Sequence, residues 1–405
     1  MSSHISSMNQ ASSENQASSV NRDSTSQTRH IILIPDSFKG TLDSTEICHL
    51  MAEAILHHKP QTKVTKIPVA DGGEGSVDAF LSAMGGNKHQ AKVKGPIGDV
   101  IDAFYGILPD GTAVVEMAAA AGLPLVGPTK DVANTTTFGV GQLISKALDQ
   151  GIKKLIVGLG GSCTNDGGCG AAAALGASFK NKNGETFIPV GGTLKDIAKI
   201  DLSGLDPRLK DIEISTMCDI DNPLTGELGA AAIFAPQKGA SPELVRILDF
   251  GLKHLAEVVR NDLHFDIEML PGAGAAGGMG GGMVAFLSSK LEMGIDVVLD
   301  TVNFDHLVQT TDLVMTGEGK IDTQSLRGKV VIGVARRSKA HNVPVFAIVG
   351  DIGDNIEPAY DMGVSGIISI NRVAVPFHEA KQRAKKDLSL TVDNFVRMLI
   401  RLGQL

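Results

Sequence analysis

A short apolar run opens the patterned part of the chain. Residues 31–35 are all apolar, and a continuous run of this length is typical of a strand buried on both faces of a parallel sheet. Residues 44–57 then carry apolar side chains at helical spacing, with Asp43 or Ser44 as the N-cap. A second run at 63–70 completes a predicted β-α-β unit.

The C-terminal third repeats this alternation of strands and helices. Its pattern predicts helices at 328–341 and 376–402 and strands at 312–316, 344–349 and 366–370. Because parallel strands in one sheet are joined by crossover helices, both ends of the chain predict a doubly wound parallel sheet.

The middle of the chain has a different sequence pattern. Glycine-rich turns and a helix near 242–262 mix there with predicted strands at 112–116, 154–159 and 212–217. We therefore predict an α/β fold of two domains. The first is a parallel-sheet domain built from both chain ends, residues 30–91 plus 286–405, and the second is an inserted α/β domain, residues 92–285.

The first 29 residues differ from all the rest. Eighteen of them are Ser, Thr, Asn or Gln, and such a segment buries too little apolar surface to offset the entropy of ordering it. We predict that residues 1–29 form a disordered tail. They carry neither the apolar core of a signal peptide nor the Arg-rich amphipathic pattern of a mitochondrial leader.

Charge and composition narrow the class of protein. Lys and Arg number 37 against 45 Asp and Glu, a net charge of −8, which argues against a general nucleic-acid binder. No apolar window of about 18 residues occurs, so no membrane span is expected and a cytoplasmic protein is the default. The four cysteines form no C-x-x-C pair, which disfavours a zinc ribbon or a disulfide framework. A homodimer is compatible with the sequence.

Five polar or glycine-rich turns each follow a predicted strand, and they occupy residues 36–40, 71–75, 160–168, 218–223 and 316–322. Ligands of open α/β sheets bind beyond the carboxyl ends of the strands, so these turns can converge on one cleft. Carboxylates there can hold Mg²⁺, lysines can neutralise phosphate and glycine backbones can cradle anions. Phosphoryl transfer needs this inventory.

Each turn also has a purely structural explanation. Asp36 and Asp166 serve equally well as helix N-caps, and Asp219 and Asp221 can close a loop through side-chain hydrogen bonds. The lysines of the turns can simply be solvated. The set is stronger than any single member because acids and lysines recur at the same end of the predicted sheet.

The densest glycine run, residues 271–282, contains the pattern G-x-G-x-x-G at 272–277. A dinucleotide fingerprint needs an apolar strand before it, and residues 265–270 carry acids that make a poor buried strand. We favour a phosphate-binding loop that leads into a helix at 283–292, and an interdomain hinge is the structural alternative. No P-loop, protein-kinase catalytic loop or G-x-S-x-G elbow is present.

The motifs, taken in order, resemble those of the bacterial glycerate kinase family, the glycerate 2-kinases of the glyoxylate and glucarate pathways. The resemblance covers residues 30–405, and it is carried by the segments 35–40, 70–75, 160–168, 218–224, 236–240 and 316–322. It implies a flavodoxin-like or Rossmann-like α/β domain with a second α/β domain inserted, and a cleft between them. It also implies transfer of the γ-phosphoryl group from ATP to D-glycerate with Mg²⁺, at the 2-hydroxyl.

Combining the turns with this resemblance gives a hypothesis for each residue. Asp71 or Asp166 would orient or deprotonate the substrate hydroxyl, Lys39 and Lys320 would stabilise charge on the phosphoryl group, and Asp219 and Asp221 would hold Mg²⁺. The nucleotide would contact Ser37, Gly160, Gly161, Ser162, Gly274, Gly277, Gly278 and Glu318, the last of which would also help with the metal. Glycerate would contact Gly72, Gly73, Asn165 and Arg327, whose guanidinium fork suits a carboxylate.

Other functions stay open at this point. Formation of 3-phosphoglycerate would keep the kinase but move the phosphoryl group. The G-x-G-x-x-G pattern leaves a nicotinamide-dependent hydroxy-acid dehydrogenase as an alternative, and a non-catalytic glycerate sensor could use the same cleft. Arg327 could also be an ordinary arginine at a helix start.

Overall fold

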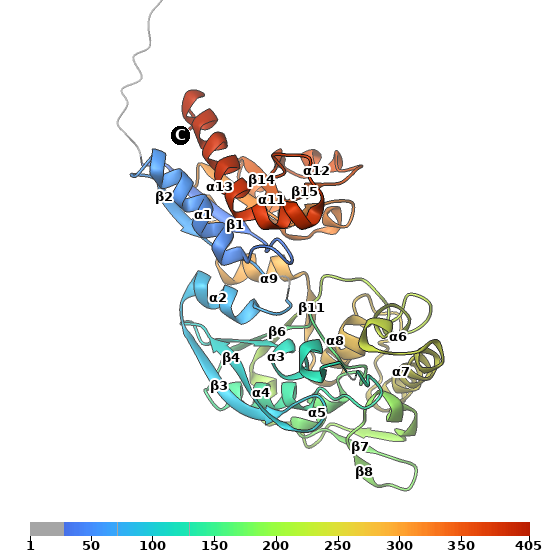
Figure 1. The fold of residues 1–405 in the computed structure, drawn as a ribbon. Helices are drawn as coiled ribbons and strands as arrows, with labels where there is room; N and C mark the ends of the chain where they lie inside the picture. Colours follow the sequence, from blue (N-terminus) through green and yellow to red (C-terminus); the bar gives the residue numbers. More distant parts are fainter. Residues whose placement is uncertain (1–27, 71, 129) are drawn as a thin grey trace, which may run out of the picture.

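The chain folds into two lobes, and the smaller lobe contains both the first strand and the C-terminal helix (Figure 1). The computed structural model describes residues 28–70, 72–128 and 130–405. Most of the predicted tail, residues 1–27, therefore lies outside the described residues, as does Asp71.

A parallel five-stranded sheet forms the centre of the smaller lobe. Its strands run in the order β2-β1-β12-β14-β16, and every pairing is parallel. Numbered within this lobe the order is 2-1-3-4-5, which is the flavodoxin-like order. The strands are β1 (His30–Pro35), β2 (Lys63–Lys66), β12 (Leu313–Gly317), β14 (Val345–Val349) and β16 (Val364–Ser369).

Helices cover both faces of this sheet. Successive side chains of β1 point to opposite faces, so its apolar residues pack against helices on both sides. Ile31 and Leu33 join the apolar cluster under α1 and α13, whereas Ile32 and Ile34 join the cluster under α9, α10 and α11. Asp43 begins α1 by accepting a hydrogen bond from the Glu46 N–H. The helices are α1 (Ser44–His58), α9 (Gly294–Thr301), α10 (Phe304–Val308), α11 (Val330–Ala340), α12 (Pro358–Asp361) and α13 (Phe377–Arg401).

A mixed six-stranded sheet forms the centre of the larger lobe, in the order β11-β10-β6-β5-β4-β3. Its first four strands are parallel, and β4 and β3 are antiparallel additions at the edge. The strands are β3 (Asn87–Lys94), β4 (Val100–Ile107), β5 (Thr112–Glu116), β6 (Lys154–Gly158), β10 (Glu213–Met217) and β11 (Lys290–Glu292).

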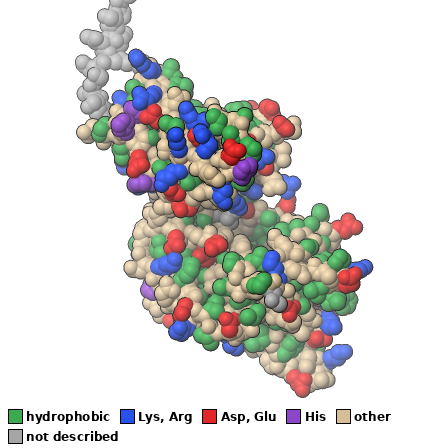
Figure 2. All heavy atoms as spheres, viewed as in Figure 1, with side chains coloured by type: hydrophobic (Ala, Val, Ile, Leu, Met, Phe, Trp, Pro, Cys, Tyr) green, Lys and Arg blue, Asp and Glu red, His purple; other side chains and the backbone are tan. Residues whose placement is uncertain are grey.

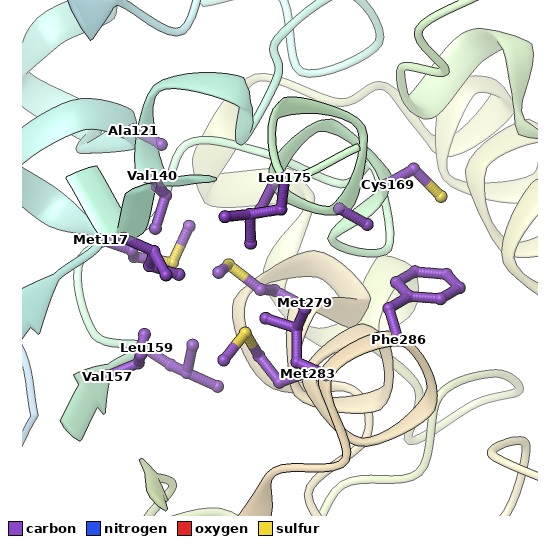
Figure 3. Close-up of a cluster of buried hydrophobic side chains, with 14 of the residues drawn as sticks. Met117, Ala121, Val140, Val157, Leu159, Cys169, Leu175, Met279, Met283 and Phe286 are labelled. Atoms are coloured by element: carbon purple, nitrogen blue, oxygen red, sulfur yellow. The ribbon is translucent and has the colours of Figure 1, made fainter. Parts of the chain in front are cut away.

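The core of the larger lobe lies where its helices meet this sheet. Figure 3 shows Met279, Met283 and Phe286 of α8 among side chains from β6, α4 and α5. Cys169 belongs to this cluster, and all four cysteines are buried and free. The helices of this lobe are α2 (Ser76–Met84), α3 (Ala118–Ala121), α4 (Phe138–Leu148), α5 (Cys169–Ala174), α6 (Ala230–Phe234), α7 (Pro242–Leu263) and α8 (Ala275–Leu287).

Short elements decorate both lobes. A three-stranded antiparallel sheet combines β7 (Ser178–Lys180), β8 (Thr186–Phe187) and β9 (Lys199–Asp201), and a two-stranded parallel one combines β13 (Lys320–Ile321) and β15 (Asp351–Ile352). Single 3-10 turns are η1 (Leu123–Val126), η2 (Gly191–Asp196), η3 (Pro207–Asp211), η4 (Pro236–Lys238) and η5 (Ser325–Arg327).

The predicted fold class, a parallel-sheet α/β domain from both chain ends with an inserted α/β domain, is confirmed. Two local predictions are wrong. The predicted helix at 283–292 is instead the end of α8 followed by β11, and the predicted strand at 63–70 ends at Lys66. The six-stranded sheet reaches from residue 87 to residue 292, further than the predicted boundaries at 92 and 285, and the division into domains at those boundaries stays a prediction.

Candidate functional site

A cleft of about 1040 Å³ lies between the two lobes, at the upper end of the range of small-molecule sites, about 300–1,000 Å³. The smaller lobe contributes the turns that follow β1 and β12, and the larger lobe contributes those that follow β6 and β10. β1 and β12 are the neighbouring strands at which the strand order reverses direction, which is where open α/β sheets bind ligands. The sequence-predicted convergence of the polar turns is therefore what the fold produces.

The cleft brings together many of the residues singled out from the sequence. They are Ser37, Lys39, Gly73, Gly160, Gly161, Ser162, Asp219, Glu318 and Lys320. On the face of the molecule shown in Figure 2, positive and negative side chains are mixed over both lobes. The visible surface is not divided by charge, and the lysines and acids that matter for the site are those that line the cleft.

Two carboxyl groups of the smaller lobe lie at the ends of β1 and β12. Asp36 and Glu318 are both buried and both line the cleft. Burial, helped by the negative charge of Asp36 and opposed by a hydrogen bond from the Ser325 hydroxyl, raises the pKa of Glu318 to about 7. Glu318 Oε1 has no hydrogen-bond partner among the described residues. A carboxyl group with a pKa near neutrality in a cleft is suited to accept a proton.

Glycines let the turns of the larger lobe approach closely. The Gly160 N–H donates to the Gly72 carbonyl over 2.9 Å, and a Cβ at Gly160 would lie 2.4 Å from the Gly73 Cα. Gly277 has a φ of +67°, and a Cβ there would lie 2.0 Å from the Thr164 carbonyl oxygen. These positions require glycine because no room exists for a side chain.

The same contacts change the role predicted for the glycine loops. The N–H groups of Gly160, Gly167 and Gly274 donate to the carbonyls of Gly72, Gly277 and Asn222. Within the glycine-dense run, Gly274, Gly277 and Gly278 do not line the cleft, whereas Ala275 and Ala276 do. These glycines serve close packing, so a phosphate cradle built from them has few N–H groups left to offer.

Asp166 is fully buried, and its carboxylate accepts hydrogen bonds mainly from backbone N–H groups. It accepts hydrogen bonds from the N–H and hydroxyl of Thr137 and from the N–H groups of Gly168 and Gly170, over 2.7–3.3 Å. Burial raises its pKa, and these hydrogen bonds oppose the rise. Asp166 does not line the cleft, and its contacts are those of a residue that ties the start of α4 to α5.

The neighbouring residues of this loop are buried without partners. Thr164 Oγ1 and both amide atoms of Asn165 make no hydrogen bond among the described residues. An unpaired buried polar group costs about 1–3 kcal/mol, so these atoms are suited to a polar ligand group or to water. Gly72 and Asn165, both predicted to contact the substrate, do not line the cleft.

Two predicted residues pair with each other across the lobes. Arg327, in η5, lies 3.4 Å from Asp221, which follows β10. Both side chains are mostly exposed, and neither residue lines the cleft.

Asp219 lies two residues before Asp221, lines the cleft, and accepts a hydrogen bond from the Gly294 N–H at the start of α9. Lys320 is 3.7 Å from Asp351 and half exposed.

Sequence reasoning missed one buried cation. Lys238, at the end of η4, is only 2% exposed and donates to Ser162 Oγ and to the Thr164 carbonyl, each over 2.7 Å. It lines the cleft together with Gln237 and Lys329. The segment 236–240 was already among the motifs that carried the family resemblance, so its lysine could have been found there.

The donor set of the cleft suits Mg²⁺. No group of three or more His, Cys, Asp or Glu side chains is close enough to hold a metal ion among the residues that the structure describes. Mg²⁺ usually binds through one or two carboxylates, with water and phosphate oxygens completing the shell. Asp36 and Asp219 line the cleft and can supply such carboxylates, whereas Asp221 does not line it.

The G-x-G-x-x-G pattern lacks the context of a dinucleotide fingerprint. Residues 265–270 form no strand, and residues 276–278 adopt left-handed φ angles before α8 becomes regular. The fold and the cleft instead define a two-lobed α/β protein with a polar cleft between its lobes. No helix in the described part of the chain is long and apolar enough to cross a membrane.

Comparison with known proteins identifies the family. A sequence model of the glycerate kinase family matches residues 31–400. The chain is 45% identical over 342 residues to glycerate 2-kinase of Escherichia coli (strain K12), an alignment that covers 84% of this chain and 90% of the relative. It is 44% identical over 363 residues to glycerate kinase of Bacillus subtilis (strain 168), covering 89% and 95%. The chain belongs to the glycerate kinase family and is a kinase of that family.

The fold agrees with this assignment. A crystal structure from Salmonella typhimurium LT2, of a protein assigned as glycerate kinase 2, superimposes with a TM-score of 0.84 at 40% identity, covering 94% of this chain and all of that one. The resemblance inferred from the motifs is confirmed.

Proposed function

We propose that the chain transfers the γ-phosphoryl group of ATP to the 2-hydroxyl of D-glycerate, with Mg²⁺, to give 2-phosphoglycerate and ADP. The observation that carries the proposal is the cleft at the β1–β12 switch point, where acids and lysines from both lobes meet. The family and the name of the Escherichia coli relative, glycerate 2-kinase, support the acceptor and the position. The enzyme would act in the cytoplasm.

Glu318 is the group that we propose accepts the proton of the attacking hydroxyl. It lines the cleft, has an oxygen without a partner among the described residues, and has a pKa of about 7 because it is buried. A base is most effective when its pKa lies near the working pH. The sequence analysis assigned Glu318 to the nucleotide and Asp71 or Asp166 to the hydroxyl. The Asp166 carboxylate is engaged by Thr137 and by the N–H groups of Gly168 and Gly170.

Cationic side chains would stabilise the transferring phosphoryl group. Lys39 and Lys320 line the cleft on the side of the smaller lobe, and positive charge placed against the phosphoryl oxygens is the main source of catalysis in phosphoryl transfer. Ser37, Gly160 and Gly161 line the same cleft and are the proposed nucleotide contacts.

Asp219 and Asp36 are the residues that we propose help hold Mg²⁺. When bound, the ion would neutralise charge on the β- and γ-phosphate oxygens. Each of the two carboxylates lines the cleft, Asp36 from the smaller lobe and Asp219 from the larger one.

Arg327 is the proposed partner of the glycerate carboxylate. Its ion pair with Asp221 is exposed, and exposed pairs contribute about 0–1 kcal/mol, so the guanidinium can exchange Asp221 for a ligand. Gly73 lines the cleft and stays a proposed glycerate contact. The assignments of Asp71, Gly72 and Asn165 to the acceptor stay predictions.

Phosphorus NMR of the protein with D-glycerate, ATP and Mg²⁺ tests the proposal. We expect the signal of 2-phosphoglycerate to appear as that of ATP declines. A 3-phosphoglycerate signal would keep the kinase and overturn the position of transfer. Absence of any phosphoester from folded protein, with or without Mg²⁺, would overturn the proposed reaction.

A further inference from the structure

The buried lysine of the cleft has an unusual environment. Lys238 is 2% exposed, and among the residues that the structure describes it forms no ion pair with a carboxylate; its two partners are the Ser162 hydroxyl and the Thr164 carbonyl. Asp166, an acid whose charge acts on Lys238, has its carboxylate engaged by Thr137 and by backbone N–H groups. Burying an ammonium group without a counter-charge is costly, so a purely structural role explains this side chain poorly.

The chemistry of the ammonium group fixes the direction of its hydrogen bond. A protonated lysine only donates, so Ser162 Oγ must accept from Lys238 Nζ over their 2.7 Å contact. The hydrogen of the Ser162 hydroxyl must then point to another acceptor. Ser162 lines the cleft, and no acceptor for that hydrogen is found among the described residues.

Two of the backbone donors on this turn already have partners. The Gly160 N–H is bound to Gly72, and the Cys163 N–H is bound to Ala121. The Ser162 hydroxyl is therefore a donor that the turn can present to an anion in the cleft. The positive charge behind it strengthens that donor, because hydrogen bonds in a chain polarise one another.

We propose that Lys238 is a positioning residue that fixes the Ser162 hydroxyl as a hydrogen-bond donor to an anionic oxygen of the bound ligand, either a phosphate of the nucleotide or the carboxylate of the acid. This proposal rests on the proposed function for the identity of the two ligands. The presence of the donor in the cleft does not depend on that function. Ser162 makes the contact, and Lys238 acts through it.

The charge on Lys238 is sensitive to pH. Burial lowers its pKa to about 8, while the nearby Cys163 and Asp166 act in the opposite direction. Another charged residue of this region is Lys130, which donates to the carbonyl of Gln237. As the pH rises through about 8, the amine becomes neutral and can accept the Ser162 hydrogen, which turns the donor away from the ligand. Ligand affinity is therefore expected to fall at alkaline pH.

Steady-state kinetics of Ser162→Ala, Lys238→Met, Lys238→Arg and the double variant Ser162→Ala/Lys238→Met test the proposal between pH 7 and 9. We expect Ser162→Ala to raise one of the two KM values about tenfold, as for loss of a charge-assisted hydrogen bond. Lys238→Met should have a similar effect, and the double variant should be little worse than either single one, since the residues act as a unit. The KM that responds identifies the anion as phosphate or carboxylate.

The pH dependence separates this role from simple support of the loop. The wild-type KM should rise between pH 7 and 9, and the KM of Ser162→Ala and of Lys238→Arg should be flat over that range, because arginine stays charged. Ser178→Ala, in β7 away from the cleft, is the matched control. Unchanged KM values and an unchanged pH profile in folded Ser162→Ala would overturn the proposal, as would fully additive effects in the double variant.

Calorimetric titration separates failure of this inference from failure of the proposed function. ADP and D-glycerate are titrated separately into wild type and Ser162→Ala. Weaker binding of one anion to Ser162→Ala would support the donor even if the wild type forms no phosphoester. Equal binding of both anions to the two proteins would overturn the donor even if the wild type is an active kinase.

Discussion

Arg327 Nη1 lies 3.4 Å from Asp221 Oδ2, and this ion pair connects the two lobes beside the cleft. The sequence had assigned the two residues to different ligands, Arg327 to the glycerate carboxylate and Asp221 to Mg²⁺. Their side chains are 70% and 74% exposed, so the pair contributes at most about 1 kcal/mol. A contact this weak can be exchanged when substrate enters.

The exchange predicts opposite effects for the two partners. Asp221→Asn should lower the KM for glycerate by about two- to fivefold, because the competing carboxylate is gone. Arg327→Ala should raise that KM at least about tenfold, because a charge-assisted hydrogen bond to the substrate is lost. Steady-state kinetics at saturating ATP measures both, and Asp102→Asn, which breaks the equally exposed pair with Lys92, is the control.

The same variants test the metal assignment. If Asp221 serves only Arg327, the Mg²⁺ concentration for half-maximal activity should not change in Asp221→Asn. A tenfold rise in that concentration would restore Asp221 to the metal site. A higher glycerate KM in Asp221→Asn would contradict the exchange.

Replacement of Glu318 should separate activity from stability. Glu318→Gln keeps the shape of the side chain and removes its basicity, so kcat is expected to fall by about 10²–10⁴ as for loss of a general base. In the wild type, kcat/KM should decrease as the pH falls below about 7, because the pKa of this carboxyl is raised to about 7. Rates measured from pH 5.5 to 8.5 test both points. Wild-type turnover in Glu318→Gln would remove it from the mechanism.

The same substitution, which should lower activity, should raise the stability of the folded protein at alkaline pH. Because the folded-state pKa of Glu318 lies above its ordinary value, burial of its neutral form favours folding below about pH 4.5, and this contribution is lost as the pH rises through about 7. At pH 8 a charged, buried carboxylate remains. Glu318→Gln should therefore raise the free energy of unfolding at pH 8 by about 1–3 kcal/mol, and by much less at pH 5. Urea unfolding at both values measures the difference.

The sequence predicted the parts of the fold that local pattern controls. The apolar run of β1 and the helical spacing of α1 identify their elements because burial on both faces or on one stripe leaves a periodic trace. The end of α8 and the strand β11 were mistaken for one helix, since a three-residue strand carries no period of its own. The pairing of β11 with β10 joins segments far apart in the sequence, so no local pattern predicts it.

The site was predictable to a similar limit. Asp36, Lys39 and Glu318 meet because strands ending at the same sheet edge must deliver their turns together. Sequence could not show that Asp166 is fully buried, that Arg327 faces Asp221, or that Lys238 donates to Ser162. Those relationships depend on which side of each turn is packed, and residue type alone does not fix it.

Contact between the glycine-dense run and the loop at 160–168 predicts a steric effect at Gly277. Its Cβ would lie 2.0 Å from the Thr164 carbonyl, and its φ is +67°. Gly277→Ala should destabilise the protein by at least about 2 kcal/mol, since backbone must move. Gly127→Ala is the matched control, because Gly127 has a φ of +60° and open space around its Cβ position. Equal losses in the two variants, measured by urea unfolding, would show that φ strain rather than the clash determines the cost.

Asp166 gives the sharpest test of a structural against a catalytic role. Its Oδ2 accepts from the Thr137 N–H and hydroxyl and from the Gly170 N–H, while Oδ1 accepts from the Gly168 N–H. An asparagine would set an amide nitrogen against one of these groups of donors. Asp166→Asn should therefore cost about 2–4 kcal/mol of stability by leaving buried donors unpaired.

Its turnover should stay within about threefold of wild type when the rate is expressed per folded molecule, because the carboxylate does not reach the cleft. Asp110→Asn makes the same change at an exposed turn, where the carboxylate accepts from Thr112, and controls for the substitution itself. Urea unfolding and kcat measured on the same preparations give the two numbers. A stable Asp166→Asn protein with kcat reduced a hundredfold would return Asp166 to the reaction.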